Sequence, residues 1–158
     1  AAAYFARGTG HTPQAGYSER PDDWENNLAR LAQKHDTART LVPKPAVDER
    51  AGAKVGIISY GSADPAVVEA RDQLREAGIE TSYLRLKALP LDETTREFIG
   101  KYDHVYVVEI NFDAQMRSLL QLHTPEYATR LIAANKCDGL PLTAQFIADK
   151  VKQGEGKA

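Results

Sequence analysis

The polar residues best suited to chemistry follow two apolar runs of the sequence, residues 55–58 and 105–108. Tyr60, Gly61 and Ser62 come after the first run, and Glu109, Asn111 and Gln115 come after the second. A carboxylate and two amides at the end of a buried strand need hydrogen-bond partners, because burying them without partners is costly. They could fix a loop, meet another subunit or contact a substrate. The pattern favours a structural or interface role over direct catalysis.

The turn at Gly61 and Ser62 leads into a predicted helix, and a helix N-terminus can bind a phosphate through its free N–H groups. This turn has one glycine where the phosphate-binding fingerprints have two or three. Asp64 stands where its carboxylate would cap the helix and repel an anion. The sequence therefore argues against a nucleotide site, and it predicts that Asp64 caps this helix.

Nucleophilic catalysis and metal binding have no supporting pattern. Ser59, Ser62 and Cys137 are possible nucleophiles, but the sequence contains no Gly-x-Ser-x-Gly elbow. The four histidines are scattered without the paired spacing of metal ligands, and there is no Cys-x-x-Cys pair. A hydrolase that uses Ser62 stays open as a hypothesis. We expect no metal and no resident cofactor in these residues.

A glycine-rich segment opens the chain, and residues 4–20 are predicted to form an irregular arm. Within it, a short motif could line an interface or a crevice: Gly8, Thr9, Gly10 and His11. Pro21 followed by two acidic residues marks the start of a helix. Trp24 is expected to anchor this helix against the body of the domain. Residues 41–53, which include two prolines, are predicted to be a linker.

From residue 54 onwards, apolar runs alternate with amphipathic segments. The predicted strands are residues 54–59, 80–86, 104–109 and a short strand around 131–132, and the predicted helices are 65–77, 92–100, one opened by Asp113 and one after Pro141. Four such units build a mainly parallel sheet covered by helices, a three-layer α/β/α domain. The strand of mixed polarity, residues 80–86, is expected near an edge. If the two most apolar strands are central neighbours, the strand order reverses between them, and ligands tend to bind at such a reversal.

The predicted organisation has three segments. Residues 1–53 supply the arm, the first helix and the linker, residues 54–153 form the sheet domain as one structural unit with the arm, and residues 154–158 form a disordered tail. The first residue is not Met, so we expect a piece of a longer protein.

The charge balance gives no reason to expect a nucleic-acid or membrane partner. Twenty basic and 22 acidic residues leave a formal net charge of −2, too small for a long-range attraction to either surface. The longest apolar runs are far shorter than the ~20 residues that cross a bilayer. The single Cys137 rules out an internal disulfide and fits the reducing cytoplasm.

Five segments in the same order resemble the C-terminal domain of the α subunit of 2-oxoacid:ferredoxin oxidoreductases, notably the 2-oxoglutarate enzymes. They are residues 7–11, residues 16–17 with the helix 24–34, residues 57–62, residues 107–111 with 114–115, and residues 137–141. One departure is visible, because Ala114 stands where the family often has glycine before the glutamine.

The resemblance implies a transketolase C-terminal-domain-like fold, with a short antiparallel edge strand. The whole enzymes of this family convert a 2-oxoacid to an acyl-CoA with thiamine diphosphate and Mg, and pass electrons to ferredoxin through an iron–sulfur cluster. The implied partners are the remaining α-subunit domains and the β subunit, with ferredoxin and CoA for the whole enzyme. One cysteine cannot hold a four-thiolate cluster alone. The implied role is therefore support and assembly, and no catalytic residue is carried over.

A second hypothesis is a free-standing, flavodoxin-like module that binds a small molecule. It would use the crevice beside Ser62, Glu109 and Asn111, where two strands end at the predicted reversal.

Overall fold

The computed structural model describes residues 9–157. The chain divides into two compact units, with the boundary between Val42 and Pro43. Each unit is described by itself.

The first unit consists of a loop and a long helix, α1 (Pro21–Leu41). Pro21 in the first turn and the acids that follow it mark the helix start, as predicted. All of α1 is described, and none of its residues is buried. The indole of Trp24 lies against the loop, because a Cβ at Gly10 would come within 2.7 Å of Trp24 Nε1. The contact found for Trp24 is therefore inside its own unit, on a glycine that leaves room for the ring.

The second unit is built on a mainly parallel sheet, as predicted, and its described strands follow the order β1-β3-β2-β4-β5. The strands are β1 (Ala46–Asp48), β2 (Val55–Tyr60), β3 (Thr81–Leu86), β4 (His104–Glu109) and β5 (Leu131–Asn135). β1 pairs antiparallel with β3, and the other pairs are parallel. The segment predicted as a linker thus contains the edge strand β1, and β3 is not at the edge.

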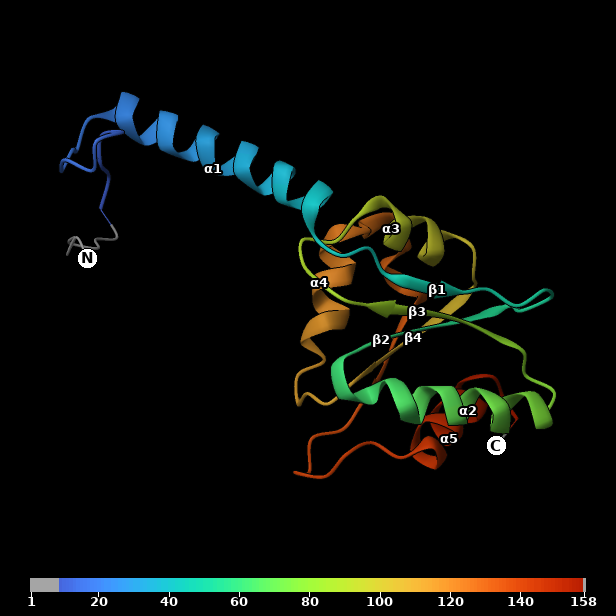
Figure 1. Ribbon diagram of the computed structural model, residues 1–158. Helices are drawn as coiled ribbons and strands as arrows, with labels where there is room; N and C mark the ends of the chain where they lie inside the picture. The colour runs from blue at the N-terminus through green and yellow to red at the C-terminus, as the bar shows by residue number, and fades with distance from the viewer. Residues whose placement is uncertain (1–8, 158) are drawn as a thin grey trace. The chain divides into compact units, whose positions relative to one another are not determined.

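Helices cover both faces of this sheet in a three-layer arrangement (Figure 1). They are α2 (Asp64–Glu76), α3 (Glu93–Gly100), α4 (Gln115–His123) and α5 (Ala144–Gly154), with 3-10 turns η1 (Gly61–Ala63) and η2 (Pro125–Arg130). α2 and α5 pack on one face, and α3 and α4 on the other. The start of α3 is as predicted, because the Asp92 side chain accepts a hydrogen bond from the backbone N–H of Thr95.

Side chains of the central strand β2 belong to both apolar cores. Ile57 points into the core under α2 and α5, and Ile58 points into the core under α3 and α4, because side chains alternate along a strand. Gly56 faces the second core, where a Cβ would come within 2.9 Å of Tyr102 and 3.1 Å of Phe98. These two aromatic rings occupy the space that a side chain at residue 56 would need.

The edge strand β1 is held by a buried arginine. Arg71 of α2 is only 2% exposed, and its guanidinium donates to Asp48 Oδ2 at 2.5 Å and to the carbonyl of Thr81 at 3.0 Å. It also lies over the ring of Tyr83, 5.6 Å from the centroid. The hydrogen bond from Arg71 lowers the pKa of Asp48 below its ordinary value of 3.8.

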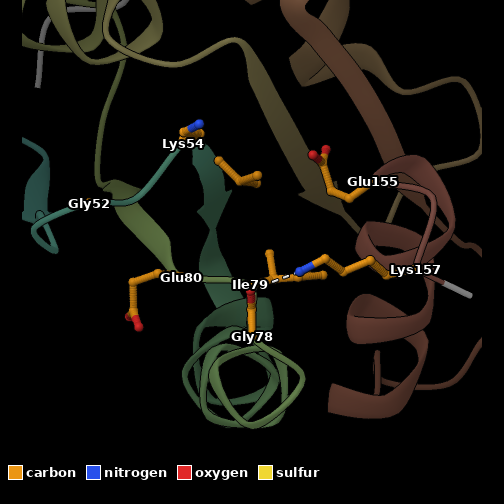
Figure 2. A pocket seen from close by; sticks show the side chains of 8 residues that line it. Gly52, Lys54, Gly78, Ile79, Glu80, Glu155 and Lys157 are labelled. Atoms are coloured by element: carbon orange, nitrogen blue, oxygen red, sulfur yellow. Dashed lines mark hydrogen bonds between the residues drawn. The ribbon is translucent and has the colours of Figure 1, made fainter.

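The segment predicted to be a disordered tail has specific partners. Glu155 Oε1 accepts a hydrogen bond from the hydroxyl of Tyr106 at 2.8 Å and lies 2.7 Å from His104 Nδ1. Figure 2 shows Lys157 reaching the carbonyl of Gly78, at 2.9 Å, just past the end of α2. A cation is favourable there, because the C-terminal end of a helix carries a partial negative charge.

We predict that Asp48→Asn loosens β1 in a pH-dependent way. A lowered pKa means that the ion pair adds stability above the unfolded-state pKa and loses it as the pH falls through the folded-state pKa. The variant should therefore be less stable than the wild type at about pH 7, and the difference between their free energies of unfolding should become smaller towards about pH 3. Urea unfolding at both pH values measures this.

The exposed Asp149 of α5 supplies the matched control, Asp149→Asn. If the difference in free energy of unfolding between wild type and Asp48→Asn does not change with pH, the ion pair between Asp48 and Arg71 does not contribute as proposed.

Candidate functional site

The carboxyl ends of β2 and β4 mark the point where the strand order reverses. β2 lies between β3 and β4. The chain therefore runs from β2 to β3 on one side and then crosses back to β4 on the other side. This is the reversal that the sequence predicted. Burial and, to a lesser extent, the negative charge of Glu109 raise the pKa of Tyr60.

Glu109 is buried, with 1% of its surface exposed, and its carboxylate caps α4. Oε2 accepts the backbone N–H of Met116 at 2.9 Å, and Oε1 accepts that of Arg117 at 3.1 Å. These are N–H groups of the first helical turn, which have no partner within the helix. A carboxylate is favoured at this end by the helix dipole. The strand thus provides the cap that the loop itself lacks.

The predicted start of α4 at Asp113 is wrong, because the helix begins at Gln115. The residue before it, Ala114, has φ 52° and ψ 51°, in the left-handed region. This region disfavours side chains with a Cβ by roughly 1–2 kcal/mol. The position where this chain departs from the glycine of the resembling family is therefore one whose backbone suits glycine.

Asn111 and Gln115 hold the β4–α4 loop together. Asn111 Nδ2 donates to Gln115 Oε1 at 3.1 Å, and Asn111 Oδ1 accepts the backbone N–H of Asp113 at 2.9 Å. Asn135, at the end of β5, donates to the carbonyls of Asn111 and Phe112, both at 2.9 Å. Asn135 is not among the site residues predicted from the sequence. Its position directly after an apolar strand is the signal that could have drawn attention to it.

The prediction that Asp64 caps α2 is wrong. The helix begins at Asp64 after Ala63, and no side chain caps it. The Asp64 carboxylate instead accepts a hydrogen bond from the Tyr83 hydroxyl at 2.8 Å and pairs with Arg85 at 3.1 Å. The Tyr83 oxygen also lies 2.5 Å from Ser59 Oγ.

This polar chain joins β2, β3 and α2 under the carboxyl edge. Burial is the main cause that raises the pKa of Tyr83, and the Asp64 carboxylate adds to it. A hydroxyl that stays protonated and donates to a carboxylate serves to fix Asp64 rather than to attack a substrate. Sequence reasoning missed this network, because no local pattern links residues 59 and 83.

Ser62 and Gly61 lie at the surface of the turn η1. Gly61 has φ 61°, a left-handed backbone that favours glycine. In the part of the chain that the structure describes, no histidine or carboxylate forms a hydrogen bond with Ser62. A serine nucleophile needs an adjacent base, so this geometry gives no support to the hydrolase hypothesis.

The N-terminal motif forms a small hydrogen-bonded loop within the first unit, although Gly8 lies outside the described residues. Asn27 Nδ2 donates to the carbonyl of His11 at 2.7 Å, and His11 Nδ1 lies 2.8 Å from the carbonyl of Thr12. Gly10 packs against Trp24, as described above, and Thr9 precedes it at the surface. The structure therefore brings Thr9, Gly10 and His11 together with α1.

A hollow of about 260 Å³ lies at the opposite end of the sheet, where β2 and β3 begin (Figure 2). Charged side chains line it, but most already have partners in the protein. Glu155 and Lys157 form the contacts given above, and Glu80 Oε1 accepts a hydrogen bond from Arg50 at 3.0 Å. The hollow is therefore lined by groups that tie the ends of elements together.

Residues 9–157 contain no group of three His, Cys, Asp or Glu side chains placed to hold a metal ion. Within the same residues, no helix is both long and apolar enough to cross a membrane. Asp64, Glu109, Asn111 and Asn135 at the carboxyl edge bind other side chains or the backbone. These contacts can fix loops.

Comparison with known proteins first defines the class of fold. A solved structure described as a split-gene transketolase, inactive beta4 tetramer, matches 70% of this chain and 40% of its own, with a TM-score of 0.57 and 20% identity. At this level of sequence identity, the match is evidence for the fold alone. The second unit accordingly has a fold of the transketolase C-terminal-domain type.

The nearer relatives are 2-oxoacid:ferredoxin oxidoreductases. The 2-oxoglutarate:ferredoxin oxidoreductase from Magnetococcus marinus, solved with 2-oxoglutarate, coenzyme A and succinyl-CoA bound, matches 96% of this chain with a TM-score of 0.80 and 26% identity. The 2-oxoacid:ferredoxin oxidoreductase 2, subunit alpha, of Aeropyrum pernix is 29% identical over 103 residues, or 64% of this chain. No family model matches. The resemblance found in the sequence is thus confirmed.

These relatives are much longer than the chain. The 158 residues span 16% of the Aeropyrum pernix protein and 27% of the Magnetococcus marinus chain.

We predict that Glu109→Leu destabilises the second unit by about 2–4 kcal/mol, because two N–H groups at the start of α4 lose their acceptor in a buried site. Urea unfolding followed by circular dichroism measures the change. Glu76→Leu is the matched control, since Glu76 is exposed at the end of α2. Equal stability of Glu109→Leu and wild type would contradict the capping role.

Proposed function

We propose that this chain is a non-catalytic support and assembly domain of the α subunit of a 2-oxoacid:ferredoxin oxidoreductase. The observation that carries the proposal is the 96% coverage of this chain by a 2-oxoglutarate enzyme at a TM-score of 0.80. The site geometry supports the same role. The carboxylate and amides at the sheet reversal, where a catalytic group would be expected, are engaged in capping α4 and fixing a loop.

The substrate proposed for the whole enzyme is a 2-oxoacid, with 2-oxoglutarate favoured by the identity of the Magnetococcus marinus relative. The product would be an acyl-CoA, with electrons passed to ferredoxin. The partners of this domain would be the remaining domains of its own subunit and a β subunit. We place the complete enzyme in the cytoplasm, since the single cysteine suits a reducing compartment.

The iron–sulfur cluster expected for the whole enzyme does not fit the side chains of this chain. An iron–sulfur cluster takes four thiolates, and the sequence contains one cysteine. Residues 9–157 also contain no group of three His, Cys, Asp or Glu side chains placed to hold a metal ion. We propose that other parts of the enzyme hold thiamine diphosphate, Mg and the cluster.

The proposal predicts that removing this domain prevents assembly. In the full-length subunit that carries this sequence, deletion of residues 43–158 should abolish co-purification with the partner subunit, as measured by size-exclusion chromatography with light scattering. The physical reason is that such a subunit loses a folded, largely apolar-cored unit that would form part of its interfaces. A truncated subunit that assembles and oxidises 2-oxoglutarate at the wild-type rate would overturn the support role.

A complementary measurement uses the 158-residue chain alone. It should show cooperative thermal unfolding and no reduction of a viologen dye with 2-oxoglutarate, CoA, thiamine diphosphate and Mg supplied. Turnover by the isolated chain would contradict a purely supporting domain.

A further inference from the structure

One face of α4 and the loop before it carries large apolar side chains that nothing in the second unit covers. Phe112 is 82% exposed, Leu122 is 80% exposed and Leu119 is 44% exposed. Leu119 and Leu122 are spaced by three and four residues from the exposed polar residues Gln115 and Ser118, so these four side chains lie on one side of the helix. Phe112 precedes them in the loop before α4. We call this set the α4 stripe: Phe112, Gln115, Ser118, Leu119 and Leu122.

The two polar members of the α4 stripe already have hydrogen bonds inside the protein. Gln115 Oε1 accepts from Asn111 Nδ2 at 3.1 Å, and Ser118 Oγ donates to the carbonyl of Ala114 at 3.1 Å. Polar groups lose free energy on burial mainly when they lose their partners. Covering the α4 stripe would therefore remove apolar surface from water without breaking these bonds. None of its five residues carries a charge.

Contacts on the side of α4 opposite the α4 stripe, and at both ends of the helix, fix it to the rest of the second unit. Leu120 on the opposite side is fully buried in the core, and Glu109 caps the first turn. At the other end, Thr124 Oγ1 donates to the carbonyl of Leu120 at 2.8 Å. A docking surface that is already ordered costs less conformational entropy when a partner binds.

The size of the α4 stripe points to a partner larger than a second copy of the same helix. One phenylalanine and two leucines expose apolar surface on the order of 300 Å², whereas a stable interface takes about 800 Å² from each partner. α4 has nine residues, so two copies packed helix to helix would fall well short of that area. The occupant must extend past α4 over neighbouring surface, which a separate domain can do.

We infer that the α4 stripe is the docking surface for an apolar face of another domain of the same oxidoreductase, outside these 158 residues. The inference rests on the proposed function. Its occupant follows from the length of the relatives, of which this chain spans 16% and 27%. Proteins of that kind have most of their chain available to cover this face.

Cysteine labelling in the complete enzyme tests the inference. Leu122→Cys and the control Glu76→Cys, on the exposed end of α2, are each made in a Cys137→Ser background. Each enzyme is treated with a maleimide, and the labelled peptides are quantified by mass spectrometry. The same variants unfolded in denaturant give the reference rate.

The expected result is that labelling of Leu122→Cys is slowed at least about tenfold in the native enzyme relative to the unfolded one, and more than that of Glu76→Cys. Leu122→Asn supplies a second measurement, and it should lower the midpoint of thermal unfolding of the complete enzyme by more than Val68→Asn does, where Val68 is an exposed apolar residue of α2.

If Leu122→Cys is labelled in the native enzyme at the unfolded rate, the inference is overturned and the proposed function is not affected. Slowing that appears only as the enzyme concentration rises would mean that a second copy covers the α4 stripe, and would overturn it too. A wild-type chain that does not co-purify with the rest of the enzyme would overturn the proposed function, and with it the proposed occupant.

Discussion

The hydrogen bonds from the start of α4 to the Glu109 carboxylate are the constraint on which the carboxyl edge of this domain depends. A carboxylate with 1% exposure would be costly without partners, and the first N–H groups of α4 would be unpaired without an acceptor. Each group satisfies the other. Because Glu109 belongs to a central strand, this contact fixes α4 directly to the sheet. The left-handed turn at Ala114 is the backbone conformation that brings the helix onto the carboxylate.

The same contact explains why the sheet reversal, the usual place for a ligand in such folds, is occupied by protein in this chain. Glu109 points into the helix, Asn111 and Asn135 close the loop, and Asp64 is turned towards Tyr83 and Arg85. These polar side chains form hydrogen bonds within the domain, whereas Phe112 and two leucines of α4 are exposed at the surface. This distribution is the reverse of a catalytic crevice, where polar groups face a substrate. It suits a domain whose outer surface is met by other protein.

Long-range pairs hold the edge strand β1 and the C-terminal residues of the second unit in place. Arg71 ties α2 to the edge strand β1, and Glu155 and Lys157 tie the end of the chain to β4 and to the end of α2. These contacts join residues 23 to 79 positions apart. They fix the edge strand β1 and the end of the chain to the rest of the second unit.

The sequence by itself determined the elements whose signals are local. Neighbouring residues indicate the apolar runs of β2 and β4, the N-cap at Asp92 and the proline start of α1, and the ordered motifs resemble those of the oxidoreductase family. Tertiary structure alone decided the partners of Asp64, Glu109 and Asn135, and it decided that residues 46–48 form an edge strand. A carboxylate can cap its own helix or bind any donor that the fold brings within about 3 Å. Which donor arrives depends on strand register and helix packing, and no pattern of adjacent residues contains that information.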